Sequence, residues 1–354
     1  MVSEADSVRI NLLRTVLIFG IVVVHIPPAM VEAPPHSDVF GMVKYSFSRA
    51  LFRAAVPVLT VISGYLLFLR PERLAYRSVA IQKSQRLLWP FLLWNIPFVA
   101  LLYVIQSRGM LAHDFRFQLY PADMSVLLDA AFAWREGPLN YPLNFLRDLF
   151  VLMLAYPLFL WLARIAGWWA LPAVWLFFVF NLDGPIINRA LMPACFYLGA
   201  LLALRKVDLQ KLDRFWPVAI VVLIAASVAV AWFDIRNLTY FKTLAVPLIW
   251  ISAAPLAATG TGKWLAGLGE YSFFVFLTHG FAVLALWLVW SQVAPPGAYA
   301  IFWVLAPFVV FAGAAIGFAV LRTLFPHLAD ILIGKFGKTK PRRATQLPEG
   351  ISGD

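Results

Sequence analysis

Two ionisable residues, Arg14 and His25, lie within the first apolar stretch of the sequence, RINLLRTVLIFGIVVVHIPPAM at residues 9–30. Their spacing of eleven positions amounts on an α-helix to about 1100° of rotation, roughly 20° beyond three turns, with a rise of about 16 Å. Both side chains therefore project from one helix face at different depths. Ionisable groups inside a membrane span are costly and usually face a protein interior or a water-filled cavity. We interpret the pair as part of a reaction site within the membrane.

His25 carries the side chain that is most readily tuned as a general base near neutral pH. Pro27 and Pro28 follow directly and end the predicted helix just beyond it. The alternative is a histidine that only caps the helix end or bonds to a neighbouring span, but an arginine on the same face favours a catalytic role. Asp148 lies at a similar predicted depth in a later span, so it could pair with His25 as in a histidine–carboxylate dyad.

The second apolar segment, SFSRALFRAAVPVLTVISGYLLF, carries Arg49 and Arg53 on one helix face near its external end. Their guanidinium groups could bind a carboxylate or a phosphate, or stabilise a developing oxyanion. The alternative is a charged head that reaches back to the membrane interface, which suits Arg49 better than Arg53. Arg53 is therefore the predicted substrate contact.

Lys83 and Arg86 lie one helical turn apart at the entry to the third span and are followed by Pro90. Neighbouring cations at such a place suit the phosphates of a nucleotide-like ligand. Ordinary anchoring of a span by positive charge is the alternative.

The fourth span opens with PLNFLRDLF, which places Asn144 and Asp148 on one face and Arg147 beside them. We expect Asn144 and Arg147 to contact substrate, although Arg147 and Asp148 could instead neutralise each other. In the ninth span, His279 lies at mid-depth, where a hydrogen bond to a backbone carbonyl is the favoured role.

The composition places these residues in a membrane protein. The chain has 354 residues, of which 62% are hydrophobic and 13% charged, against about 25% charged in an average soluble domain. The net charge of +11 fits cytoplasmic loops and anionic lipid head groups better than nucleic acid. Cys195 is the only cysteine, which excludes an intrachain disulfide and a cysteine-based metal cluster, and we expect no metal.

Apolar windows of about 17 to 25 residues predict an all-α polytopic fold with about ten transmembrane helices. They cover residues 10–31, 45–69, 86–105, 144–163, 168–182, 189–204, 216–233, 239–258, 271–291 and 299–323, and the fifth and sixth are short. Basic residues gather in the links after the second and sixth spans and in the tail, all on one side of a ten-span chain. By the positive-inside rule that side is the cytoplasm, so both termini are expected there.

Residues 1–325 are expected to form one transmembrane domain, and residues 326–354 a polar, basic cytoplasmic tail without fixed structure. The longest segment between spans, residues 106–141, falls on the external side. Its aromatic and acidic residues could contact a sugar or lie along the membrane interface.

A series of motifs in this order resembles the membrane-bound acyltransferase 3 family. They are Arg14-x10-His25, Val56-Pro57 with Ser63-Gly64-Tyr65, Lys83-x-x-Arg86 with Pro90, Pro142-x-x-Phe145-Leu146, and Tyr271-Ser272 with His279. The segments RAAVP…SGYLL and NFLRDLF look most like those of exopolysaccharide acetyl- and succinyltransferases. Asn144 replaces a tryptophan that is common in the family, a change expected to alter contacts with the acceptor.

Members of that family transfer acyl groups, usually acetyl and sometimes succinyl, from cytoplasmic acyl-coenzyme A to hydroxyls of envelope or secreted glycans. The resemblance implies that His25 is catalytic, that Arg14 is its essential partner, and that Lys83 and Arg86 lie near the donor. It implies acetyl-CoA or succinyl-CoA as donor and a glycan or lipid-linked saccharide as acceptor. It also implies a multi-pass protein among the lipids of a bacterial inner membrane, with no nucleic acid partner.

The alternative function is a membrane transporter or lipid flippase, in which Arg14, His25, Asp148 and His279 would form a polar pathway. No pair of interrupted helices stands at matching positions in two halves of the sequence, so the acyltransferase is the preferred interpretation.

Overall fold

The computed structural model describes residues 3–27, 38–109, 117–121, 123–135, 137–182, 186–295 and 297–336. Within these ranges the chain forms helices joined by short connections, with no strand. The α-helices are α1 (Glu4–Val24), α2 (Val39–Tyr45), α3 (Ala55–Phe68), α4 (Tyr76–Lys83), α5 (Trp89–Ser107), α6 (Met124–Phe132), α7 (Asn144–Leu154), α8 (Tyr156–Ile165), α9 (Ala170–Val179), α10 (Met192–Leu204), α11 (Trp216–Trp232), α12 (Thr239–Ser252), α13 (Ala254–Ala257), α14 (Gly260–Gly267), α15 (Ser272–Val293), α16 (Tyr299–Leu324) and α17 (Pro326–Leu332). The π-helical pieces are η1 (Ser46–Ala50) and η4 (Ser84–Leu88), and the 3₁₀-helical pieces are η2 (Leu51–Ala54), η3 (Pro71–Arg73), η5 (Tyr141–Leu143), η6 (Gly167–Trp169), η7 (Leu209–Phe215) and η8 (Leu268–Glu270).

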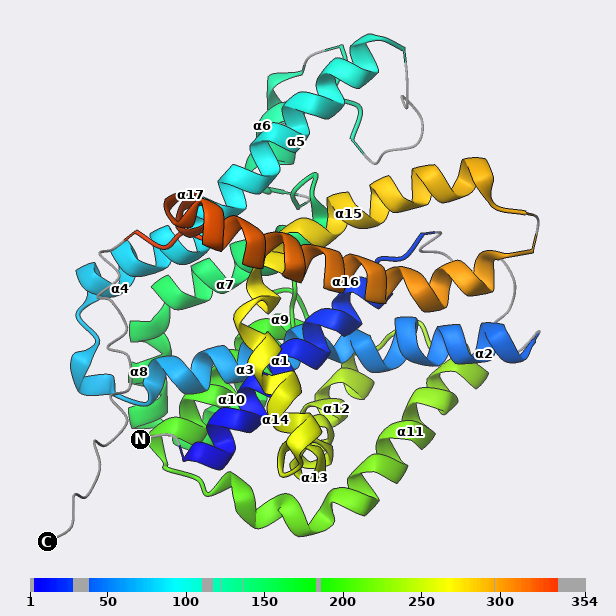
Figure 1. Ribbon diagram of the computed structural model, residues 1–354. Coiled ribbons are helices and arrows are strands. Elements are labelled where there is room, and N and C mark those ends of the chain that lie inside the picture. Colours follow the sequence, from blue (N-terminus) through cyan, green and yellow to red (C-terminus); the bar gives the residue numbers. More distant parts are fainter. Residues whose placement is uncertain are drawn as a thin grey trace, which may run out of the picture.

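The central helix α1 positions both predicted reaction groups. It begins after Ser3, whose hydroxyl oxygen accepts a hydrogen bond from the amide of Asp6 and so satisfies a free donor of the first turn. It ends at His25, because the prolines that follow cannot continue the helix. α1 packs against α3, α14, α15 and α16, and most of its side chains are buried (Figure 1).

The helix lengths agree with a multipass membrane protein. Seven helices of the described ranges are long and apolar enough to cross a membrane, some of them continuing over π- or 3₁₀-helical pieces. Tyr141–Leu154 and Tyr156–Ile165, bent by 57°, make an eighth if they count as one span. Two shorter apolar helices, Gly167–Val179 and Met192–Leu204, lie where the short fifth and sixth spans are predicted. The predicted all-helical, multipass fold is therefore confirmed.

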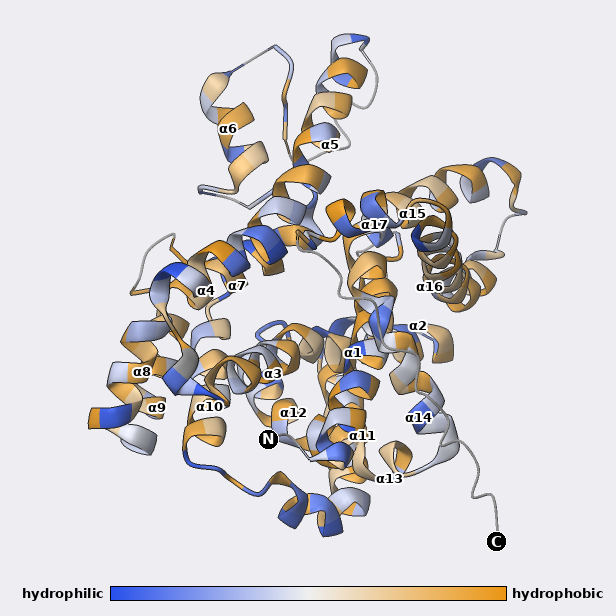
Figure 2. Ribbon diagram, turned by 60° about the vertical axis from the view of Figure 1, so that its left-hand side comes forward, coloured by the Kyte–Doolittle hydropathy of each residue, from blue (hydrophilic) through white to orange (hydrophobic). Residues whose placement is uncertain are grey.

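The outer surface is apolar along many helices, as expected of a protein surrounded by lipid. Exposed hydrophobic side chains include Leu158 and Trp161 on α8, Val221 and Ile224 on α11, and Ile316 on α16. Figure 2 shows hydrophobic residues along α8 and α16, whereas hydrophilic residues gather in connections such as the one that leads into α11. An apolar exterior of this extent is unfavourable in water and favourable in a bilayer.

Close packing of α3 against α10 depends on two glycines. A Cβ atom at Gly64 would collide with the carbonyl oxygen of Phe196, and one at Gly199 with the carbonyl oxygen of Val61. Because backbone atoms cannot move aside, only glycine permits this approach of the two helices. The contact fixes α3, which helps to line the site described below.

Two spans are irregular just before a proline, and an arginine lies in each irregular turn. Arg53 lies in η2 four residues before Pro57, and Arg86 lies in η4 four residues before Pro90. A proline cannot donate to the carbonyl four residues earlier, and its ring clashes with that carbonyl. The backbone is therefore loosened at Arg53 and Arg86, as is common at functional sites.

α5 and α6 form a small unit with an apolar core of its own. The core consists of Val99, Leu102, Phe117, Leu119, Ala130 and Leu139. The buried amide of Asn95 donates to the carbonyl oxygens of Ala130 at 2.8 Å and Ala131 at 2.7 Å. Figure 1 shows this unit projecting from the other helices. It contains the described part of the long segment predicted on the external side, while Asp114, Arg116 and Glu136 of that segment lie outside the described residues.

The segment after α16 begins with a helix and not with an unstructured tail. The carbonyl oxygens of Ile331 and Leu332 at the end of α17 accept hydrogen bonds from the indole nitrogens of Trp89, at 3.0 Å, and Trp94, at 3.1 Å. α17 is thereby attached to α5. Residues 337–354, most of the predicted basic tail, lie outside the described residues.

Candidate active site

Basic side chains from several helices line one large cavity at the first half of α1. The cavity has a volume of about 740 Å³, a size typical of sites for small molecules and cofactors. Its cationic residues are Arg14, Arg70, Lys83, Arg86, Arg322 and Lys335. Among the described lining residues, Glu270 and Asp330 carry the opposite charge, and Glu270 is paired with Arg322 at 3.0 Å. The excess of positive charge favours a ligand with several negative charges.

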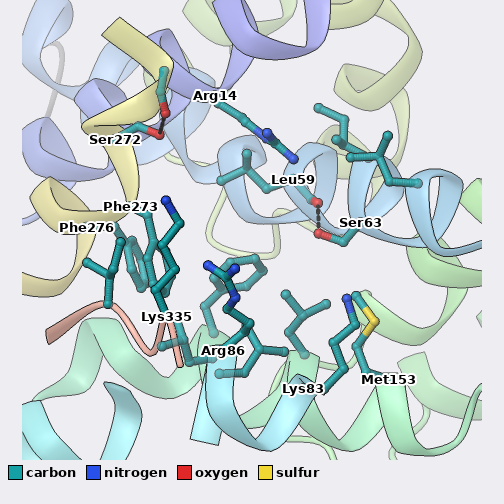
Figure 3. Close-up of a pocket in the computed structure, with 18 of the residues that line it drawn as sticks. Arg14, Leu59, Ser63, Lys83, Arg86, Met153, Ser272, Phe273, Phe276 and Lys335 are labelled. Atoms are coloured by element: carbon teal, nitrogen blue, oxygen red, sulfur yellow. Dashed lines mark hydrogen bonds between the residues drawn. The ribbon is translucent and has the colours of Figure 1, made fainter. Parts of the chain in front are cut away.

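The predicted partner of His25 and the predicted donor-binding residues meet in this cavity. Figure 3 shows Arg14 reaching in from α1, while Lys83 and Arg86 reach toward it from the opposite wall. The guanidinium of Arg14 makes one long hydrogen bond, at 3.4 Å, to the side-chain oxygen of Asn11. Arg86 is exposed, so the cavity is open to solvent at that residue. Sequence positions far apart are thus brought to one site.

Apolar side chains form the inner end of the same cavity. They include Ile18 on α1, Leu59 on α3, Phe145 on α7 and Phe276 on α15. The rings of Phe145 and Phe276 meet edge to face with their centroids 5.7 Å apart. The cavity therefore combines a cationic outer part with an apolar inner part, which suits a ligand with a charged head and an extended uncharged arm.

His25 lies beside a second histidine, His279 on α15. The centroids of the two imidazole rings are 5.1 Å apart, with 57° between the ring planes. Nδ1 of His25 donates to the carbonyl oxygen of Ile21, and Nδ1 of His279 donates to that of Phe276, each at 2.7 Å. Each Nε2 then keeps a lone pair that can accept a proton. His279 is fully buried, and its Nε2 has no hydrogen-bond partner. We call these two residues the histidine pair.

One aromatic side chain connects the cavity with the histidine pair. Phe276 lines the cavity, and the centroid of its ring lies 5.7 Å from that of His279. On α1, Arg14 and Ile18 line the cavity, whereas His25 lies further along the helix, beyond the lining. The predicted order of cation and imidazole is found, but His25 does not share the cavity with Arg14. Phe276 thus links the cavity lining to the histidine pair.

Asp148 does not pair with His25, which corrects the predicted dyad. Its carboxylate accepts from Nη1 of Arg147 at 2.8 Å and from the backbone amides of Asn188 at 3.3 Å and Arg189 at 2.9 Å. Depth along a helix indicates the level of a side chain but not the neighbour that it faces, so the sequence could not decide between these partners. The structure favours the other predicted possibility, a pair with Arg147.

The polar face of α7 holds the turn that precedes α10. Oδ1 of Asn144 accepts from the side-chain amide of Asn188 at 3.2 Å. Nη1 of Arg147 donates to the carbonyl oxygen of Ile186 as well as to Asp148. The described contacts of Asn144 and Arg147 therefore position the turn, and this turn carries Arg189.

Arg53, the predicted substrate contact in the second span, lies near the histidine pair. Its charge and that of Arg189 act on His25. Nε of Arg53 is buried without a hydrogen-bond partner. A cation at this place can stabilise negative charge that develops next to His25.

The sequence predicts a backbone hydrogen bond for His279 but not its place beside His25, and it does not single out Arg189. A usable signal for His279 is the count of histidines: of five in the chain, only His25 and His279 lie inside predicted spans. Arg189 lies in a short connection between spans, where an arginine is ordinary, so its place in the site follows from the fold.

Comparison with known proteins agrees with these features. The acyltransferase 3 family, described as an acyltransferase domain, matches residues 7–322. The chain is 31% identical over 360 residues to the succinoglycan biosynthesis protein ExoH of Rhizobium meliloti (strain 1021), and the match covers 97% of this chain and 96% of that protein. No solved structure matches the chain significantly. The chain therefore belongs to the acyltransferase 3 family and is a membrane acyltransferase.

Proposed function

We propose that this acyltransferase transfers an acetyl or succinyl group from cytoplasmic acyl-coenzyme A to hydroxyls of a cell-envelope or secreted polysaccharide. The observation that supports this most is the order of features along α1: a cation-lined cavity, an apolar inner end and then a histidine pair. The name of the Rhizobium meliloti relative, a succinoglycan biosynthesis protein, supports a polysaccharide or its lipid-linked precursor as acceptor.

The positive-inside rule supports an orientation with the cavity toward the cytoplasm of a bacterial cell, in the inner membrane. Lys83, Arg86 and Arg14 then meet the donor from the side on which acyl-coenzyme A is made. Phosphates fit the cations, and the uncharged pantetheine arm fits the apolar inner end. An extended arm is comparable to the ~16 Å of helix rise between Arg14 and His25. The opposite end, with the turn that carries Arg189, faces the acceptor.

In direct transfer, His25 acts as general base. Its Nε2 takes the proton of the acceptor hydroxyl while the hydroxyl oxygen attacks the thioester carbonyl carbon. The carbon–sulfur bond then breaks, and His25 returns the proton to the sulfur of coenzyme A. The guanidinium of Arg53 stabilises the negative oxygen of the intermediate. His279, whose ring centroid lies 5.1 Å from that of His25, can accept the proton from His25.

Transfer in two steps uses the same residues. Nε2 of His25 attacks the thioester carbonyl carbon, the carbon–sulfur bond breaks, and coenzyme A leaves as a thiolate. The acceptor hydroxyl then attacks the acyl-histidine, the bond between the acyl carbon and Nε2 breaks, and Nε2 takes the hydroxyl proton and releases it to solvent, which also protonates the thiolate. Radiolabel bound to protein after rapid denaturation at neutral pH, in the absence of acceptor, would indicate the two-step route.

Replacing His25 by Ala is expected to lower transfer by about 10²- to 10⁴-fold, the usual contribution of a general base. The protein should stay folded, because the imidazole bonds only within its own helix. The assay measures radiolabel passed from acetyl-CoA or succinyl-CoA to polysaccharide by the purified protein in vesicles. His327→Ala is the matched control, since His327 is exposed on α17 and outside the cavity lining. Wild-type transfer by the His25 variant would remove His25 from the mechanism.

A further inference from the structure

A second group of cations lies near the histidine pair, beyond the donor cavity. It consists of Arg49, Arg53, Arg189 and Lys242, which we call the distal cation cluster. They come from η1, η2, the turn before α10 and the first turn of α12. The charges of Arg49, Arg53 and Arg189 all act on Lys242, and those of Arg53 and Arg189 also act on His25. Three separate segments, the second span with η1 and η2, the turn before α10 and the start of α12, therefore converge on one positive site.

Two carboxylates that interact electrostatically with the cluster, Asp148 and Asp234, are engaged elsewhere. Asp148 accepts from Arg147 and from two backbone amides, as described above. Asp234 accepts from the hydroxyl of Tyr45 at 2.5 Å and pairs with Arg236 at 3.6 Å. Both oxygens of each group thus have other partners.

These two acids attract the cluster only from a distance. Asp148 acts on Arg189, and Asp234 and Arg49 act on each other, without forming an ion pair. Considering the residues that the structure describes, no carboxylate forms an ion pair with any of the four cations. The cluster therefore keeps an excess of positive charge.

The arginines of the cluster are partly shielded from water. Nε of Arg53 and Nε of Arg189 are buried without a hydrogen-bond partner. The guanidinium of Arg189 lies over the ring of Tyr141, 5.6 Å from its centroid, and that of Arg49 lies over Tyr45, also at 5.6 Å. Holding like charges together in a shielded place without an anion is unfavourable. A bound anion would offset this unfavourable charge, and a substrate can supply one.

We propose that the distal cation cluster binds a carboxylate carried by one of the two reacting molecules, so that the enzyme acts on an acidic substrate. The inference rests on the proposed function. The carboxylate is either the free end of a dicarboxylic acyl group such as succinyl, or an acid group of the acceptor sugar. A guanidinium binds a carboxylate through two parallel hydrogen bonds, and three arginines with one lysine can surround it.

The position of the cluster favours a carboxylate over the phosphates of the donor. The phosphates fit the cations that line the cavity, and neither His25 nor any residue of the cluster belongs to that lining. Next to His25, only the transferred acyl group and the sugar with the attacked hydroxyl need to be present. An acid group on the transferred acyl chain is a carboxylate, and sugar acids carry the same group.

Lys242→Gln is the variant that tests the site, with Arg189→Gln as a second. Neither substitution leaves a carboxylate without its ion-pair partner, so both proteins should fold. Removing an unpaired cation should even raise the thermal unfolding temperature of the substrate-free protein. Lys211→Gln is the matched control, because Lys211 is exposed in η7 and lies outside the cluster.

The assay compares substrates that differ only in the carboxylate. Succinyl-CoA is compared with butyryl-CoA, which has the same chain length without the acid. The acceptor is the polysaccharide of a strain that lacks this protein, used before and after chemical reduction of its carboxylates to alcohols. Initial rates of acyl transfer are measured for all four combinations of donor and acceptor.

A loss of tenfold or more confined to succinyl-CoA supports a site for the acyl carboxylate. The same loss confined to the unreduced acceptor supports a site for the sugar carboxylate. Unchanged rates, or equal losses for the fully neutral combination, would overturn the inference while leaving the acyltransferase itself intact. If the wild-type protein transferred no acyl group in any combination, the proposed function would fail and the inference with it.

Discussion

The donor cavity and the distal cation cluster are both basic, but they differ in access to water and in partners. The cavity is large and open at Arg86, and two acids share it with the cations. The cluster lies near His25, and two of its arginines have shielded atoms without partners. Cations in the open cavity are stabilised by solvent, so the cavity is stable without a ligand. Cations in the cluster are partly shielded from solvent and form no ion pair with a described carboxylate.

This difference indicates a division of labour along α1. In the proposed function the cavity binds the donor, which should appear in KM and depend on salt. The histidine pair contributes to the chemical step, which should appear in kcat. Substitutions in the two regions should therefore change different kinetic constants. Three predictions, in order of decreasing effect, test this separation.

Replacing His279 by Ala is expected to lower kcat by about 10²-fold, because the partner of the general base is lost. His279→Asn is the matched variant, since its amide can still donate to the carbonyl of Phe276 while Nε2 is absent. Both should bind acetyl-CoA normally, and steady-state kinetics with thermal unfolding would separate the two roles of the ring. Full activity of the Asn variant with a defective Ala variant would mean that His279 only supports the fold.

Replacing Lys83 by Gln is expected to raise the donor KM about tenfold with little change in kcat, because one charge-assisted contact to a phosphate is lost. The effect should shrink as ionic strength rises. Lys263→Gln is the control, because Lys263 is exposed on α14 and does not line the cavity. A fall in kcat at unchanged KM would mean that Lys83 acts in the chemical step, and would contradict the separation of donor binding from chemistry.

Replacing Glu270 by Gln is expected to lower the donor KM about twofold. The substitution removes a negative charge from the cavity and frees Arg322, while the exposed ion pair that it breaks adds less than about 1 kcal/mol of stability. Glu72→Gln, exposed in η3 and outside the lining, serves as control. A higher KM would show that Glu270 itself holds the donor.

The sequence predicted what depends on local periodicity. Apolar windows located the spans, and helical spacing placed Arg14 before His25 along one helix. The basic residues of the connections predicted that Lys83 and Arg86 lie at the same end of the molecule as Arg14. The structure places all three in the lining of one cavity. The bond from His279 to a backbone carbonyl was also predicted correctly, since it forms within one helix.

The remaining features depend on which helices face each other. His279 meets His25 because α15 packs on α1, and Asp148 turns to the connection before α10 because Asn188 and Arg189 offer backbone amides there. Lys242 and Arg189 look like ordinary interfacial cations in the sequence, and only the fold brings them to the span that carries Arg49 and Arg53. A local signal for the irregular sites does exist, because Arg53 and Arg86 each precede a proline by four residues.

Binding of the donor by variants of each region tests the division of labour most directly. Equilibrium dissociation constants for acetyl-CoA would be measured with purified His25→Ala and with the Lys83→Gln, Arg86→Gln double variant. We expect the His25 variant to bind with the wild-type Kd and transfer almost nothing, and the double variant to bind at least tenfold more weakly while keeping its kcat at saturation. Weak binding by the His25 variant, or wild-type binding by the double variant, would contradict the separation of donor binding from chemistry along α1.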